Sequence, residues 1–89
     1  MAAKVVTYDL NRETVRPAIT KKLKETCPNW AMLSESCYAV ETALSNQAVY
    51  DALKPILDDN DALFVFDLKM PIVGAGPDEV VAWIHRNVA

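Results

Sequence analysis

Residues 5–10, which read VVTYDL, decide the fold of this chain. The stretch is a run of β-branched and aromatic residues that ends with Asp9, and the turn residues Asn11 and Arg12 follow directly. This composition predicts a strand at the centre of a sheet, because apolar residues occupy both of its alternating faces. The strand delivers one carboxylate to the end of the sheet. Asp9 then has two interpretations: it caps the turn, or it binds a metal ion.

Length and composition predict one small domain that covers residues 1–89. Of the 89 residues, 52% are hydrophobic. A chain this short buries roughly 60–65% of the surface that its unfolded form exposes, so its own core gives only marginal stability. The surplus of apolar residues therefore favours a homodimer, in which a second copy covers what one copy leaves exposed.

Charge and cysteine content narrow the functional classes. The net charge is −3, and the densest basic run, residues 21–24, is interpreted either as a solvated helix face or as a phosphate contact. Cys27 and Cys37 lack the spacing of a metal site, and the one His cannot complete a set with them. No apolar run reaches about 18 residues, and none follows the N-terminus. We therefore expect a cytoplasmic protein with no membrane partner.

Periodicity along the chain predicts seven elements. Four strands are expected, at residues 4–10, 30–35, 37–42 and 62–68, with a tight turn or bulge at Glu35-Ser36. Three helices are expected: one capped by Thr14, one capped by Ser45 and interrupted at Pro55, and one begun by Pro77. In the first helix Ala18, Ile19 and Leu23 should face the core, with Arg16 and Lys24 outside. In the last, Val80, Val81, Ile84 and Val88 should point inward, and Trp83 should flank an interface.

This element order predicts an α+β fold, the ferredoxin-like plait. Its βαββαβ arrangement forms one antiparallel sheet with two helices on one face, and the short C-terminal helix is added to it. Val5 and Thr7 point to the other face, which suggests a second subunit there. Because the first and fourth strands run antiparallel in a plait, Asp9 and Asp67 should lie at opposite ends of the sheet and share no metal.

The ordered motifs resemble a known family. Tyr8-Asp9 at the end of the first strand and Ser36-Cys37-Tyr38 on the third resemble the small CRISPR-associated Cas-two nucleases and the virulence-associated protein D ribonucleases. The chain is also similar to stand-alone bacterial proteins labelled SinR-like or Cas-two-like. The segments shared with them are residues 30–36 (WAMLSES), 44–49 (LSNQAV), 59–65 (DNDALFV) and the C-terminal helix.

The resemblance implies a homodimeric, magnesium-dependent hydrolase. Two Asp9 side chains would meet near the dimer axis and hold one Mg²⁺, which activates water and stabilises charge on a phosphodiester of RNA or DNA. Tyr8, Asn11, Arg12 and Ser36 are the candidate substrate contacts around this endonuclease site.

The chain departs from the nuclease pattern in two respects. It is acidic, and it has no second acid or His near Asp9 in sequence. These departures favour an alternative function, a catalytically inactive dimeric adaptor that binds a protein partner through its exposed helices or through residues 71–76.

Overall fold

The computed structural model describes residues 1–89, apart from the side chain of Glu13. It contains four strands: β1 (Ala2–Asp9), β2 (Asn29–Ser34), β3 (Cys37–Thr42) and β4 (Ala62–Asp67). It contains three α-helices: α1 (Arg16–Thr26), α2 (Asn46–Leu53) and α3 (Asp78–Asn87). Short 3₁₀ turns precede α1 at Glu13–Val15 and extend α2 at Lys54–Ile56.

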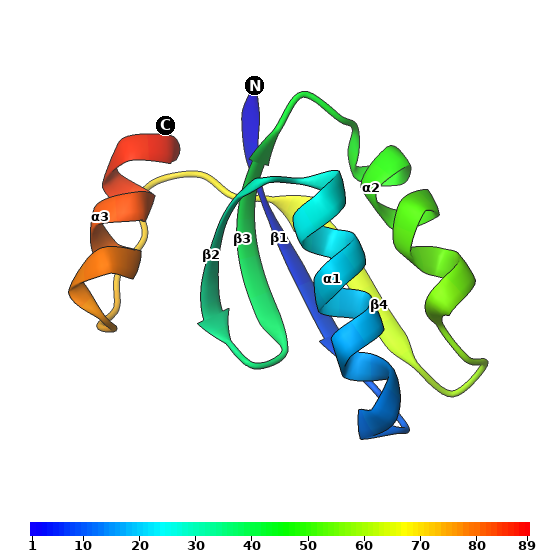
Figure 1. The fold of residues 1–89 in the computed structure, drawn as a ribbon. Coiled ribbons are helices and arrows are strands. Elements are labelled where there is room, and N and C mark those ends of the chain that lie inside the picture. Colours follow the sequence, from blue (N-terminus) through cyan, green and yellow to red (C-terminus); the bar gives the residue numbers. More distant parts are fainter.

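The strands form one antiparallel sheet in the order β2-β3-β1-β4 (Figure 1). β1 lies between β3 and β4, so its predicted central position is confirmed. Helices α1 and α2 cover one face of the sheet, and α3 lies against the other (Figure 1). The chain is therefore a small α+β domain whose architecture is compatible with a ferredoxin-like plait.

The larger part of the core lies between the sheet and the first two helices. It combines Val6 and Tyr8 of β1 with Ile19 and Leu23 of α1 and Val49 of α2. These side chains are buried because both helices present an apolar stripe with three-to-four spacing to the sheet. The alternation along β1 is confirmed, since Val6 and Tyr8 belong to this cluster.

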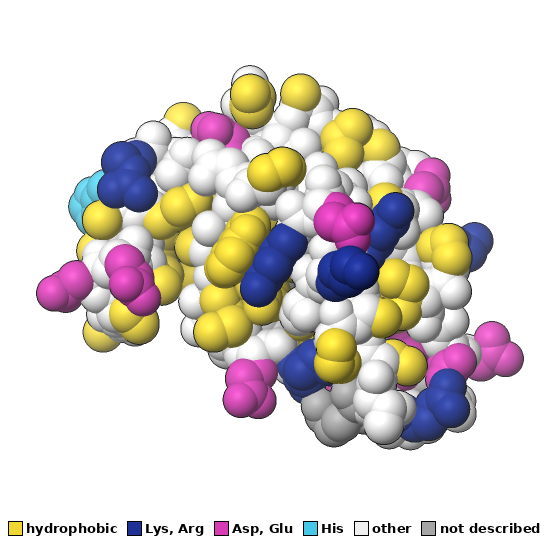
Figure 2. Space-filling view, in the orientation of Figure 1, with side chains coloured by type: hydrophobic (Ala, Val, Ile, Leu, Met, Phe, Trp, Pro, Cys, Tyr) yellow, Lys and Arg dark blue, Asp and Glu magenta, His cyan; other side chains and the backbone are white. Residues whose placement is uncertain are grey.

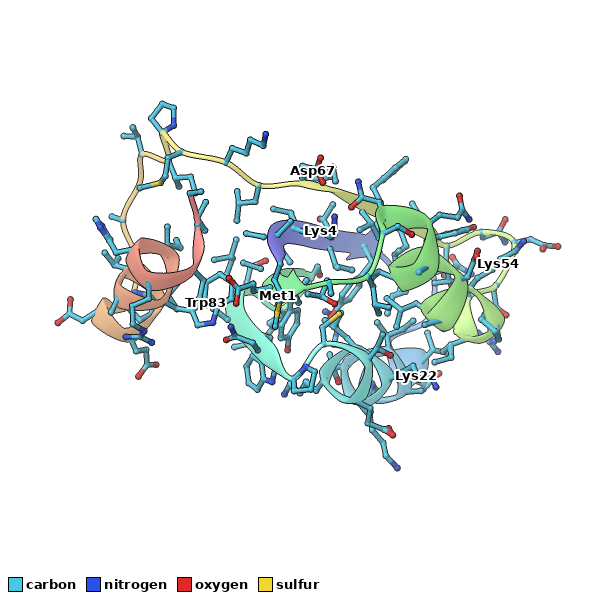
Figure 3. All side chains as sticks on the ribbon, turned by 90° about the horizontal axis from the view of Figure 1, so that it is seen from above. Met1, Lys4, Lys22, Lys54, Asp67 and Trp83 are labelled. Atoms are coloured by element: carbon cyan, nitrogen blue, oxygen red, sulfur yellow. The ribbon has the colours of Figure 1, made fainter. Side chains whose placement is uncertain are left out.

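A smaller apolar cluster joins α3 to the opposite face of the sheet. Trp83 is only 6% exposed, packs in a cluster with Ala31 and Ala39, and donates its indole N–H to Asn29 Oδ1 at 2.8 Å (Figure 3). Val80, Ile84 and Val88 belong to this cluster or pack against it, as predicted. Two predictions were wrong: Val81 is 37% exposed, and Trp83, expected to flank an interface, is buried within the chain. The inward face of α3 is extended to Trp83 because the small alanines of the sheet leave room for the large indole ring.

Local capping signals were borne out unevenly. The hydroxyl of Ser45 accepts the N–H of Ala48 at 3.0 Å, so Ser45 caps α2 as predicted. Thr14 does not cap α1: Val15 occupies that position without a side-chain hydrogen bond. α2 ends at Leu53, and Pro55 lies in the 3₁₀ turn that follows, since the missing N–H of proline interrupts the α-helical hydrogen bonds.

The hairpin of β2 and β3 turns at Glu35-Ser36, as predicted. The pairing register shifts between Met32 and Ser34, which places a bulge just before the turn. The backbone N–H of Tyr8 then donates to the carbonyl of Ser36 at 2.9 Å. The hairpin turn is thereby tied to the end of β1, where the candidate site residues lie.

Candidate functional site at the end of strand β1

Asp9 is the last residue of β1, and it is exposed. It lies opposite Ala62 of β4 in the sheet register. Because Tyr8 points into the core under α1 and α2, Asp9 points to the other face of the sheet. Among the described side chains, none forms a hydrogen bond with the Asp9 carboxylate, which is therefore available to a ligand.

The turn after β1 is capped by Asp61, and Asp9 takes no part. Asp61 Oδ1 accepts the backbone N–H of Asn11 at 2.6 Å, and its Oδ2 accepts the N–H of Asp58 at 2.8 Å. These bonds from Asp58 and Asn11 to the ionised form lower the pKa of Asp61. The interpretation of Asp9 as the cap of this turn thus loses its support, because a residue 50 positions away makes the bond to Asn11.

Arg12 is also held by the acidic turn. Its guanidinium lies 2.5 Å from a carboxylate oxygen of Asp58, and the two side chains are 60% and 42% exposed. An exposed pair of this kind contributes about 0–1 kcal/mol, so a phosphate could replace Asp58 at little cost. Asn11 and Arg12 stand next to Asp9 in sequence, and the structure brings both to the turn that includes Asp58 and Asp61.

Tyr8, Ser36 and Arg16 come together on the helix-covered side. The Tyr8 hydroxyl donates to the carbonyl of Glu35 at 3.0 Å, and Arg16 Nη1 lies 3.1 Å from Ser36 Oγ. Arg16 also donates to the Glu35 carbonyl, and its guanidinium lies 5.6 Å from the centre of the Tyr8 ring. Burial raises the pKa of Tyr8, so its hydroxyl stays protonated and acts as a donor.

A cation and two aromatic rings continue this cluster along α1. Lys24 Nζ lies 4.2 Å from the centre of the Trp30 ring and 5.9 Å from that of Tyr38. The two rings meet edge to face, with centroids 5.8 Å apart. The expectation that Arg16 and Lys24 lie on the outer face of α1 was wrong, and Ala18, expected inside, is exposed. Long side chains at helix spacing can lay their stems on aromatic surface and keep the charge near water.

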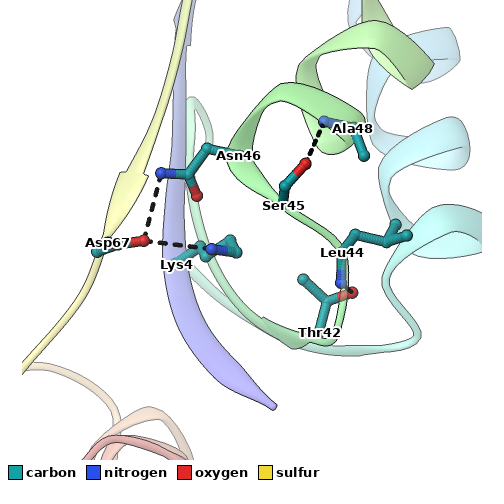
Figure 4. Close-up of polar contacts among 7 residues, drawn as sticks. All are labelled: Lys4, Thr42, Leu44, Ser45, Asn46, Ala48 and Asp67. Atoms are coloured by element: carbon teal, nitrogen blue, oxygen red, sulfur yellow. Dashed lines mark hydrogen bonds and ion pairs between the residues drawn. The ribbon is translucent and has the colours of Figure 1, made fainter.

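Asp67 lies at the other end of the sheet from Asp9, as predicted. It pairs with Lys4 in the register, whereas Asp9 pairs with Ala62. Lys4 Nζ lies 3.2 Å from Asp67 Oδ1, and the amide of Asn46 donates to the same oxygen at 3.3 Å (Figure 4). The hydrogen bond from Lys4, then that from Asn46, lowers the pKa of Asp67. This contact was not predicted, because an N-terminal Lys carries no sequence signal that it will be buried.

α3 leaves the β4 side of the sheet face uncovered. Phe64 pairs with Thr7 and Phe66 with Val5, so both rings share the face on which Asp9 lies. They are 66% and 47% exposed. The face that was predicted to meet a second subunit is therefore half occupied by the chain's own helix and half open, with aromatic side chains on the open half.

Within one chain, no group of three or more metal-ligating side chains is found among those described. The described helices include none that is long and apolar enough to span a membrane.

Comparison with known proteins bears on the fold alone. No protein-family model matches the chain, and no curated protein matches it. Among solved structures, the chain is similar to a hypothetical protein, TT1823, from Thermus thermophilus, with a TM-score of 0.60. The two sequences are 22% identical, and the match covers 85% of this chain and 94% of the other. The shared backbone thus extends over most of both chains.

Proposed function

We propose that the chain is a ferredoxin-like plait that works as a homodimer, with the two copies meeting through the open part of the sheet. The element order and the strand order β2-β3-β1-β4 support the plait. The exposed rings of Phe64 and Phe66 support the dimer, because exposed aromatic side chains that share one sheet face are typical of an interface.

In this dimer, two Asp9 carboxylates form a Mg²⁺-dependent endonuclease site for RNA or DNA. The observation that carries the proposal is that Asp9 is exposed, forms no hydrogen bond with the described side chains and lies on the same sheet face as the two phenylalanines. A two-fold axis through that face relates each Asp9 to its copy. One carboxylate does not make a magnesium site, whereas two carboxylates are ligands that suit this hard cation.

When bound, the metal would lower the pKa of a water molecule and stabilise charge on the phosphodiester. The chain's own residues would hold the substrate. Arg12 offers a guanidinium whose present partner is an exposed carboxylate. Ser36, whose hydroxyl Arg16 contacts on the helix-covered side, would meet a part of the substrate that lies across the end of β1 from Asp9. Tyr8 keeps the hairpin turn next to Asp9 through its bond to Glu35.

A cleavage assay tests this function. Labelled single- and double-stranded RNA and DNA are incubated with the protein and Mg²⁺ or Mn²⁺, with EDTA as one control. Asp9→Asn should abolish cleavage, while Asp59→Asn, which changes an exposed acid of the neighbouring turn, should keep it. Cleavage that survives both EDTA and Asp9→Asn would contradict the proposal.

The second candidate function is a catalytically inactive dimeric adaptor that binds a protein partner. The net charge of −3 favours it, since charge repulsion weakens contact with phosphates. This function predicts no cleavage of any substrate by a folded dimer, and the same assay separates the two.

A further inference from the structure

Helix α1 is a basic element in an otherwise acidic chain. Its eleven residues hold four basic side chains, Arg16, Lys21, Lys22 and Lys24, and one acid, Glu25, a net charge of +3. The chain as a whole has a net charge of −3. An anionic ligand would therefore be attracted to α1 and repelled by the rest of the surface.

The lysines of α1 are not used by the fold as ion pairs. Ion pairs in the described part of the chain join Lys4 to Asp67 and Arg12 to Asp58. Lys21 and Lys22 are exposed, and Lys24 is half-buried against aromatic rings rather than against a carboxylate. Figure 2 shows basic side chains over α1 directly beside hydrophobic ones over β2.

The hydrophobic side of this surface is an aromatic platform on the edge strand. Trp30 is 36% exposed although Lys24 lies over its ring, and the neighbouring Met32 is 47% exposed. A hollow of about 440 Å³ lies beside them, between these two residues of β2 and Val80 and Trp83 of α3. Glu79 is the acidic residue in its lining. A planar apolar group can therefore rest against Trp30 within reach of a cation.

We propose that the surface of α1 and β2 binds an unpaired nucleic-acid strand, with bases stacked on Trp30 and phosphates on Lys21 and Lys24. Stacking on one aromatic ring needs a base that is free of its own stack, so a duplex should bind less well. This inference rests on the proposed function and specifies its substrate as single-stranded. The nucleic-acid strand would then run along α1 toward the end of β1. Arg16 of the same helix contacts Ser36, and the carbonyl of Ser36 accepts the backbone N–H of Tyr8 in β1.

Tryptophan fluorescence measures this binding directly. The chain has two tryptophans, so Trp83→Phe leaves Trp30 as the reporter. Titration with 20-nucleotide oligo(U) and oligo(dT), in EDTA so that no metal-dependent cleavage occurs, should quench its emission. Two 20-base-pair duplexes, one of RNA and one of DNA, should bind at least tenfold more weakly. The oligo(U) and oligo(dT) arms distinguish RNA from DNA.

Variants then identify the surface, with labelled oligonucleotides and anisotropy as the readout in the wild-type background. Trp30→Ala should weaken binding roughly 5- to 150-fold, as expected for one lost base stack. Lys24→Gln should weaken binding and reduce the salt slope by about 0.7. Lys54→Gln, in the 3₁₀ turn after α2 (Figure 3), is the matched control and should leave both the affinity and the salt slope unchanged.

These binding measurements can contradict the inference without contradicting the proposed nuclease activity. Equal affinity for single strands and duplexes, equal affinity for polyglutamate, or equal effects of Lys24→Gln and Lys54→Gln would each overturn it. Conversely, binding in EDTA that Asp9→Asn leaves intact, together with no cleavage in Mg²⁺, would support this surface and contradict the nuclease.

Discussion

Two carboxylates, those of Asp9 and Asp61, lie near the turn that follows β1, and they differ in their hydrogen bonds. Asp61 is held by two backbone N–H groups, whereas Asp9 is exposed and makes no hydrogen bond with the described side chains. A carboxylate that accepts backbone N–H bonds stabilises the fold, whereas an exposed carboxylate without such bonds is free to bind a ligand.

We therefore expect opposite consequences of truncating these two acids. Asp9→Ala should change the free energy of unfolding by less than about 0.5 kcal/mol, as surface substitutions do. Asp61→Ala should lower the urea midpoint, because the N–H groups of Asn11 and Asp58 lose their acceptor. Equilibrium urea unfolding of both variants checks this, and a large loss of stability in Asp9→Ala would return Asp9 to a capping role.

The pair of Lys4 and Asp67 makes stability depend on pH. The pKa of Asp67 is lowered in the folded protein, so its contribution is present above the unfolded pKa and is lost as pH falls through the folded pKa. Protonation of Asp67 removes the carboxylate that pairs with Lys4, which is only 6% exposed. The urea midpoint should fall as the pH is lowered below about 4.

Asp67→Asn provides the comparison for this pH effect. It should be less stable than the wild type at pH 7, and its urea midpoint should depend less on pH between 5 and 2. Lys4→Met, which removes the buried charge and leaves an exposed carboxylate, should be tolerated better than Asp67→Asn. Parallel pH profiles for wild type and Asp67→Asn would show that this pair does not set the acid response.

At the scale of elements, α2 depends on its cap more than the other helices do. It has only eight residues, and the Ser45 hydroxyl accepts one of its first N–H groups. Ser45→Ala should lower the free energy of unfolding by about 1 kcal/mol, as loss of an N-cap does. Ser45→Asn, which restores an acceptor at the same place, should recover most of this loss in the same urea experiment. Equal stability of both variants would mean that tertiary packing alone holds the helix.

The helices and strands also show which structural features local sequence patterns predict and which they do not. Strand positions, the turn at Glu35-Ser36, the Ser45 cap and the break at Pro55 were predicted correctly, because each depends on neighbours within a few residues. The start of α1 was not, since Val15 bonds to the carbonyl of Arg12, and Arg12 is fixed by the distant Asp58. The inward faces of α1 and α3 were predicted largely correctly, but Ala18, Val81 and Trp83 were misplaced, because the sheet decides which side chains at the margin of each face are buried.

At the scale of the whole molecule, the exposed aromatic face of β4 determines the expected assembly. Phe64→Asp should raise the dimer dissociation constant at least about tenfold, since burying one phenylalanine is worth about 1.5–3 kcal/mol. Because Phe64 is 66% exposed, the monomer should remain folded. Val73→Asp is the control, as Val73 is 95% exposed and lies outside the sheet.

Sedimentation of the three proteins over a range of concentrations measures this effect. Circular dichroism of each variant confirms that the fold is kept. A wild-type protein that stays monomeric at high micromolar concentration would contradict the dimer. Such a result would also remove the second Asp9 from the proposed site, because one copy provides only one.

The sequence by itself determined the elements, their order and the α+β class, because these follow from local propensity and from periodicities of two and 3.6 residues. It also placed Asp9 and Asp67 at opposite ends, since antiparallel pairing requires that. Only the tertiary structure decided that Asp61 caps the turn, that α3 packs on the β2 side of the sheet and that Lys24 lies over Trp30. Each of these features depends on residues that are distant in sequence or on a helix rotation that packing selects. No local sequence pattern encodes such long-range contacts or rotations.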